Sequence, residues 1–224
     1  MAPIILSGKG RVTIPLRYKV GVYQIRVGCR LSKMNFDLNK LYHLYNRGNN
    51  RQKIFFNRDN YIFFLKKIRT HLFPHCNLFA YCLMPNHFHL LIQANEKSLE
   101  LDKNDKSIFS GGLRTLLSSY TRAINIQEKR TGSLFTQNTH VKSLDSNDDY
   151  GLTCFNYIHQ NPYSAKLVDK IEDWEFSSFK DYAGRRNGTL CNQIEAQKYL
   201  TMDFDNFYQQ SYQMIAEDKL KSIF

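Results

Sequence analysis

The sequence predicts an α+β fold in which helices pack on an antiparallel sheet. Between residues 37 and 185 the hydrophobic patterns indicate elements in the order strand, helix, strand, strand, helix, strand, which is typical of this class. Hydrophobic residues make up 42% of the 224 residues and aromatic residues 14%, so a sizeable core can form. No apolar run reaches the length of about 18 residues that a membrane-spanning helix needs.

The chain divides into three regions by composition. Residues 1–36 hold seven of the 31 Lys and Arg residues and none of the 20 acidic residues. We expect this segment to be a flexible basic extension, and either Met1 or Met34 can be the start of the protein. Residues 37–185 form the main domain, and residues 186–224 are predicted to be a helical addition. The net charge of +11 suits a polyanionic partner, although many basic proteins are simply soluble.

The first half of the main domain is predicted to contain a strand, a helix and a hairpin. Residues 41–45 are strand-forming, and a turn signal follows them. Residues 59–72 have apolar side chains at helical spacing, with cations towards the end, where they suit the helix dipole. Residues 77–83 form a short apolar run typical of a buried strand. The tight connection 84–86 then leads into a second strand, residues 87–93.

The second half adds two helices and one strand. Apolar side chains recur every three or four residues from Gly112 to Glu128, which predicts a long helix. A strand is expected within residues 133–144. Residues 146–149 offer side chains that can cap the start of the last helix, which runs to about Gln160. We expect the pair Asn161-Pro162 to end this helix, because Pro lacks an N–H and restrains the residue before it.

The cysteines and the N-terminus both indicate a reducing compartment. The five cysteines are an odd number and form no C-x-x-C pair, so neither a disulfide framework nor a thiolate zinc site is indicated. Reduced, mostly buried thiols are expected instead. The N-terminus lacks the pattern of a secretory signal, and we expect a cytoplasmic protein that is nucleoid-associated in a prokaryote.

The pair His87-Phe-His89 is a candidate metal site. Residues two apart on a strand point to the same face, so both imidazoles look one way and Phe88 looks the other. Two imidazoles this close can bind a divalent cation. For an isolated motif of this kind, two ordinary surface or hydrogen-bonded histidines are the commoner explanation.

Tyr157 and Asn161 are candidates for the same site. They lie four residues apart on a predicted helix and therefore share a face. If that face packs over the histidine strand, a phenol oxygen and a carboxamide oxygen join the two imidazoles. The alternative is a core aromatic residue and a residue at the end of a helix.

Four motifs, in this order, resemble the REP-associated tyrosine transposases. This family belongs to the HUH superfamily of single-strand nucleases, whose signature is His, a bulky apolar residue and His. The resemblance covers residues 38–183, and several spaced motifs are more specific than one. The motifs are Tyr42-His-Leu-Tyr-Asn-Arg-Gly48, Met84-Pro-Asn-His-Phe-His-Leu-Leu91, Tyr157-Ile-His-Gln-Asn-Pro162 and Asp173-Trp-Glu-Phe-Ser-Ser178.

The resemblance implies a fold, an activity and a set of site residues. The fold is ferredoxin-like, and the activity is the cleavage and rejoining of hairpin-containing single-stranded DNA, often repetitive palindromes, through a 5′-phosphotyrosine intermediate. His87 and His89 match the metal-binding pair, and Tyr157 matches the nucleophile. Asn161 matches the third metal ligand, where related transposases carry Gln. The expected metal is Mg²⁺ or Mn²⁺, and no other cofactor is expected.

Further residues are weaker candidates for DNA contacts. Arg47 and Arg51 follow the first strand and can contact phosphates there, and a solvated turn is an equal alternative. Phe135 and Gln137 are expected to line the DNA groove. Two other residues of the motifs are expected to pack or to form structural hydrogen bonds: His43 and Trp174.

Two other functions and two assembly states stay open at this point. One alternative is a domesticated binding module of the same fold that recognises structured DNA or RNA without turnover. Another is a phosphoesterase that uses the histidine pair with water as the nucleophile. Related insertion-sequence transposases exchange tyrosine helices within homodimers, whereas the REP-associated branch is compatible with monomers. No membrane partner is expected.

Overall fold

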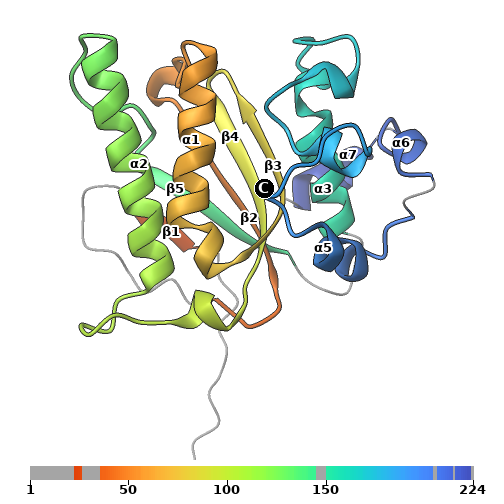
Figure 1. The fold of residues 1–224 in the computed structure, drawn as a ribbon, viewed down its shortest axis with the longest axis horizontal. Coiled ribbons are helices and arrows are strands. Elements are labelled where there is room, and N and C mark those ends of the chain that lie inside the picture. The colour runs from red at the N-terminus through yellow and green to blue at the C-terminus, as the bar shows by residue number, and fades with distance from the viewer. Residues whose placement is uncertain (1–22, 27–35, 145–149, 204–205, 214, 223–224) are drawn as a thin grey trace, which may run out of the picture.

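The computed structural model describes residues 23–26, 36–144, 150–203, 206–213 and 215–222. An antiparallel sheet with the strand order β1-β5-β2-β4-β3 forms the centre of the protein (Figure 1). The strands are β1 (Tyr23–Arg26), β2 (Leu41–Arg47), β3 (Asn77–Met84), β4 (His87–Gln93) and β5 (Asn138–Leu144).

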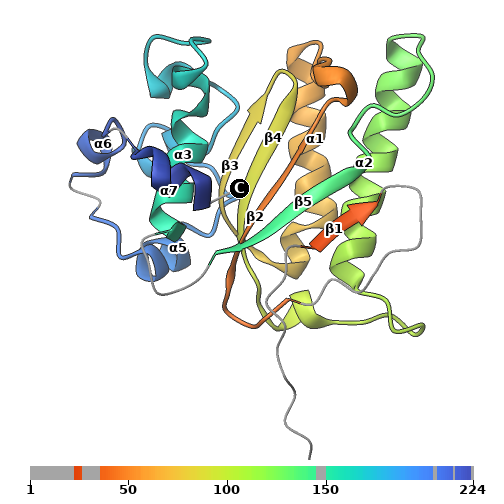
Figure 2. The ribbon, with the colours of Figure 1, turned by 180° about the vertical axis from the view of Figure 1, so that it is seen from behind.

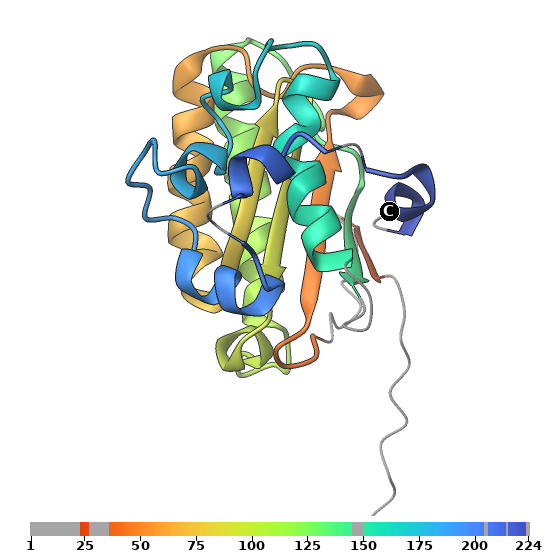
Figure 3. The same cartoon turned by 90° about the vertical axis from the view of Figure 1, so that its right-hand side faces the viewer.

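Helices cover both faces of this sheet. The helices α1 (Arg58–His71) and α2 (Ile108–Gln127) lie side by side on one face (Figures 1 and 2). The helix α3 (Tyr150–Ser164) lies on the opposite side, against β3 and β4, so that the sheet separates α1 from α3 (Figure 3). No helix in the described part of the chain is long and apolar enough to span a lipid bilayer.

The order of these elements confirms the predicted fold class. From β2 to β5 the chain runs strand, helix, strand, strand, helix, strand, with β2 and β4 in the middle and β5 and β3 beside them. This is the ferredoxin-like arrangement. The histidine strand β4 is therefore a central strand, with a neighbour on each side.

Aromatic side chains fill the space between the sheet and the first two helices. Phe64 of α1 packs against Phe88 of β4, with ring centroids 5.1 Å apart. Tyr120 of α2 packs edge-to-face on Phe64, and its hydroxyl donates a hydrogen bond of 2.7 Å to the carbonyl oxygen of Ile54. All four of these side chains are fully buried.

The helix α2 begins four residues before the predicted start at Gly112. Its first turn is capped by Ser107, whose hydroxyl accepts a hydrogen bond from the backbone N–H of Ser110. Gly111 and Gly112 lie where the first turn passes into the second. Glycine is a weak helix former, so the helix was not predicted to start before them. Gly112 is needed for packing, because a Cβ at this position would overlap the backbone of His71 on α1.

The helix α3 does not end at Asn161 as predicted, but continues through Pro162 to Ser164. Pro removes one backbone hydrogen bond, and this loss is tolerated because the helix ends within the next turn. Lys166 then takes the left-handed conformation (φ 56°), and the N–H of Leu167 donates to the carbonyl oxygen of Pro162. The expected capping segment, residues 146–149, lies outside the described residues.

Part of the basic segment expected to be a flexible arm forms a strand. β1 pairs with β5 from Tyr23 opposite Val141 to Arg26 opposite Asn138. Without it, β5 would be an edge strand with unpaired backbone groups, which readily accept another strand. Apart from Phe36, the rest of that segment lies outside the described residues, so its flexibility stays a prediction.

The region after residue 186 contains the expected helices, which pack on α3. Phe207 is buried against Phe155 of α3 and Tyr182. The helices in this part of the chain are α5 (Gln193–Leu200), α6 (Phe207–Gln210) and α7 (Glu217–Ser222), and the short helix α4 (Phe179–Tyr182) precedes them.

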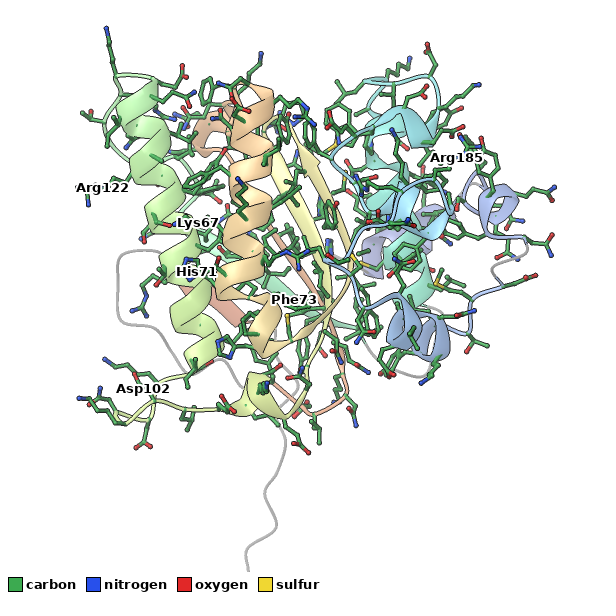
Figure 4. The ribbon with its side chains drawn as sticks, in the orientation of Figure 1. Lys67, His71, Phe73, Asp102, Arg122 and Arg185 are labelled. Carbon is green, nitrogen blue, oxygen red and sulfur yellow. The ribbon has the colours of Figure 1, made fainter. Side chains whose placement is uncertain are left out.

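A buried carboxylate connects this C-terminal region to the main domain. Glu172 accepts hydrogen bonds from the hydroxyls of Tyr208 (2.6 Å) and Tyr212 (2.7 Å), and Arg185 lies 3.0 Å from it (Figure 4 labels Arg185). Burial alone would raise the pKa of Glu172. The hydrogen bonds and the cation lower it by more, so that the pKa is about 2. The carboxylate therefore favours the folded state.

We expect Glu172→Gln to lower the free energy of unfolding by about 1.5–3 kcal/mol at pH 7, the range for hydrogen bonds to a charged group. Because the folded-state pKa is depressed, the stabilisation is present above the usual carboxyl pKa of 4.5 and is lost as pH falls towards 2. Urea unfolding at pH 7 and pH 3 should show a smaller difference between the two proteins at pH 3. An equal difference at both pH values would contradict this role of the charge.

Candidate functional site

The strand β4 presents both histidines of the H-x-H motif to the face that α3 covers. His87 lies opposite Arg47 of β2, and His89 lies opposite Tyr45. Phe88 points the other way and is fully buried in the aromatic core. The alternation predicted for this strand is confirmed.

The helix α3 brings Tyr157 and Asn161 to the same place. The Oδ1 atom of Asn161 is 3.3 Å from Nε2 of His87. The ring of Tyr157 stands edge-on to that of His89, with centroids 5.5 Å apart and planes at 86°. The structure therefore brings together all four residues predicted for the metal and the nucleophile.

Packing on two sides holds α3 in this position. The helix contacts β3 and β4 of the sheet. Phe155 packs edge-to-face on Tyr182, and His159 donates or accepts a hydrogen bond of 2.7 Å with the Ser178 hydroxyl. These contacts hold Tyr157 and Asn161 at a defined place against β4.

The hydrogen bonds of His87 leave a lone pair aimed at Asn161. Nδ1 of His87 lies 2.6 Å from the carboxamide oxygen of Asn86, which can only accept, so Nδ1 carries the proton. Nε2 then faces the Asn161 oxygen at 3.3 Å, and both atoms have lone pairs. Burial lowers the pKa of His87, which opposes a second proton on the ring. A cation between the two atoms would satisfy both of them.

His43 of β2 holds the second histidine. Its Nε2 atom is 2.9 Å from Nδ1 of His89, and the two buried rings stack with centroids 5.0 Å apart. Burial, with the neighbouring imidazoles of His43 and His87, lowers the pKa of His89 well below its usual value. His89 is therefore neutral at pH 7, the form that binds metals, and an outer partner holds its ring as in many metal sites.

The phenol of Tyr157 is protonated at neutral pH in this environment. Burial raises its pKa to about 12, although a hydrogen bond with Asn161 acts in the opposite direction. Such a group is a weak nucleophile until a cation or a base assists it. Tyr157 lies next to the histidine pair, so a cation bound by these histidines would be close to the phenol oxygen.

The donor atoms of the site can hold a divalent cation. In the described residues no group of three or more His, Cys, Asp or Glu side chains is arranged to hold a metal ion. The candidate set is instead two imidazoles and one carboxamide oxygen, from His87, His89 and Asn161. Such a set leaves coordination positions for phosphate oxygens and water, as a catalytic site requires.

The fold has a counterpart among solved structures. A REP-associated tyrosine transposase bound to a REP hairpin is similar to this chain, with a TM-score of 0.50 and 16% sequence identity. The similarity covers 72% of this chain and 89% of that one. This chain has the fold of a REP-associated tyrosine transposase. The sequence matches no protein-family model and no curated protein.

Within this transposase fold, the residues predicted to contact DNA do not all lie at the surface. Arg47, Arg51 and Gln137 are exposed, and Arg47 ends β2 directly opposite His87. Phe135 is 3% exposed and packs with Phe88 in the core. It is part of the hydrophobic core, and an isolated bridge joins its backbone to Gly48.

Two residues close to the site were not predicted from the sequence. Tyr45 lies 5.8 Å from His89 between ring centroids, and His140 of β5 stacks on Tyr45 at 4.8 Å. Both belong to the same face of the sheet as the histidine pair. Alternation along β5 places His140 on one face, but the register between strands is needed to show which neighbours it meets.

Trp174 is a packing anchor as expected, and its indole N–H donates to the carbonyl oxygen of Leu83.

Proposed function

We propose that this protein cleaves and rejoins hairpin-containing single-stranded DNA, with Tyr157 as the nucleophile and Mg²⁺ or Mn²⁺ as the cofactor. The observation that carries the proposal is the meeting of Tyr157 and Asn161 with the histidine pair, in particular the 3.3 Å approach of Asn161 to His87. A structural neighbour that is bound to a REP hairpin supports a DNA partner. The net charge of +11 is compatible with it.

In the cleavage step, the phenol oxygen of Tyr157 forms a bond to the phosphorus atom of the scissile phosphodiester. The bond from phosphorus to the 3′ oxygen breaks, the phenol proton passes to solvent, and the departing 3′ oxygen takes up a proton. The products are a free 3′-hydroxyl and a 5′-phosphotyrosine. His87, His89 and Asn161 would hold the cation, which polarises the phosphate when bound.

The rejoining step reverses this exchange. A 3′-hydroxyl attacks the phosphotyrosine, a new phosphodiester forms, and Tyr157 recovers its proton. One phosphodiester bond is exchanged for another in each step, so the reaction needs no ATP. The burial of α3 against the sheet keeps Tyr157 in place between the two steps.

A strand-transfer assay tests this proposal. The protein, Mn²⁺ and two hairpin oligonucleotides of different length, one of them labelled, should give labelled products of new length without ATP. A varied library of hairpins is needed, because the target sequence is not known. Binding to hairpins without transfer by any member of the library would instead indicate a binding module of the same fold.

We expect His43→Ala to weaken Mn²⁺ binding by about 10–100-fold, because partners outside the coordination sphere orient metal-binding imidazoles. His43 touches the Nδ1 atom of His89, so its loss frees that ring to turn. Isothermal titration with Mn²⁺ and no DNA measures the effect apart from activity. His71→Ala, on α1, is the matched control and should bind Mn²⁺ as the wild type does; equal affinity of both variants would contradict this role of His43.

A further inference from the structure

A cavity of about 530 Å³ lies between α2 and the loop that follows it. Its volume is in the range of small-ligand sites, about 300–1,000 Å³. Arg122 projects from the side of α2 that faces away from α1 (Figure 4), and Arg130 contributes from the loop. The other lining residues are Ser118, Thr121, Asn125, Ile126, Ser133 and Phe135.

The charges around this cavity favour an anion. Arg122 and Arg130 are its two charged lining residues, and no acidic side chain lines it. The hydroxyls of Ser118 and Thr121 add further polar groups of the kind that contact phosphates. A guanidinium is well matched to phosphate, because it offers several N–H donors in one plane.

Two polar atoms of the cavity lack a partner among the described residues. Nη1 of Arg130 and Oδ1 of Asn125 are buried without a hydrogen bond. The second terminal atom of each group has a partner. Nη2 of Arg130 lies 3.5 Å from the Ser133 carbonyl oxygen, and Nδ2 of Asn125 donates to the carbonyl oxygen of Gly132. Buried polar groups are nearly always hydrogen-bonded, so a donor and an acceptor left open in the lining of one cavity point to a ligand.

The cavity is connected to the candidate active site by the backbone. The N–H of Thr136 donates to the carbonyl oxygen of Arg47, and the N–H of Asn49 donates to that of Leu134, both at 2.9 Å. Arg47 lies opposite His87 in the sheet. The loop that forms one wall of the cavity is therefore joined to the strand end beside the histidine pair.

We propose that this cavity binds one nucleotide of the DNA substrate at a distance from the cleaved phosphate. This inference rests on the proposed function. Arg130, with Arg122 beside it, binds the phosphate, and Oδ1 of Asn125 accepts a hydrogen bond from an N–H of the base. Ile126, an exposed apolar side chain of the lining, supplies the apolar contact for the base.

Hairpin binding without metal tests the proposal, with the full-length protein and fluorescence anisotropy at several salt concentrations. Arg130→Gln should weaken binding about tenfold, the loss typical of a hydrogen bond to a charged group. It should also reduce the slope of log affinity against log salt by about one, as for one phosphate contact. Arg114→Gln, on the same helix but outside the cavity lining, removes the same charge and should change neither value by as much.

Oligonucleotides that each carry one neutral methylphosphonate locate the contact. At one position the neutral linkage should weaken binding to the wild type and leave binding to Arg130→Gln unchanged. If Arg130→Gln binds hairpins with the same affinity and salt slope as the wild type, the inference is wrong, even if the wild type cleaves DNA. If the wild type binds no hairpin at all, the proposed function fails together with it.

Discussion

Replacing Tyr157 by Phe is expected to reduce DNA cleavage at least about 1,000-fold, because the nucleophile is lost while its surroundings remain. Tyr157 is half-buried beside His89, and Phe fits the same space. The melting temperature and the affinity for Mn²⁺ should therefore stay close to those of the wild type. Single-turnover cleavage of a labelled hairpin measures the loss.

Tyr45→Phe is the matched control for this experiment. Tyr45 is the other tyrosine close to His89, at 5.8 Å between ring centroids, and it stacks on His140. Loss of its hydroxyl should leave most of the cleavage activity. Cleavage that survives Tyr157→Phe and disappears in Tyr45→Phe would make Tyr45 of β2 the nucleophile and would contradict our assignment to Tyr157 of α3.

Gly112→Ala is expected to destabilise the protein by about 1–3 kcal/mol, the range for a steric conflict in a packed interior. A Cβ at position 112 would overlap the carbonyl oxygen of His71, a residue on the side of α1 that faces α2 (Figure 4). Backbone atoms cannot move aside as a flexible side chain can. The two helices would have to separate.

The neighbouring Gly111→Ala should have the opposite effect. Nothing lies within 4 Å of a Cβ at position 111, and Ala is a better helix former than Gly by about 1 kcal/mol. Urea unfolding of both variants compares two equal chemical changes one residue apart. Equal effects would show that the close approach of α1 and α2 does not limit packing at this point.

Local patterns predicted much of the candidate site. The alternation around Phe88 showed that His87 and His89 share a face, and helical spacing showed the same for Tyr157 and Asn161. Both statements concern residues within one element, where geometry follows from the period of the helix or strand. The resemblance to a known family then suggested that the two elements meet.

Contacts between elements were harder to predict. The contact of His43 with His89 depends on the register of β2 against β4, which is set by packing across the whole sheet. Phe135 lies in the core because its loop is hydrogen-bonded to the segment after Arg47.

Mapping the covalent adduct is the most direct test of the central claim. The protein is incubated with hairpin DNA and Mn²⁺, denatured and digested with protease and nuclease, and the modified peptide is identified by mass spectrometry. The account predicts a nucleotide on Tyr157, absent without metal and absent from the His87→Ala/His89→Ala variant. Cleaved DNA without any protein adduct would make water the nucleophile, and a nucleotide on another tyrosine would contradict the site described above.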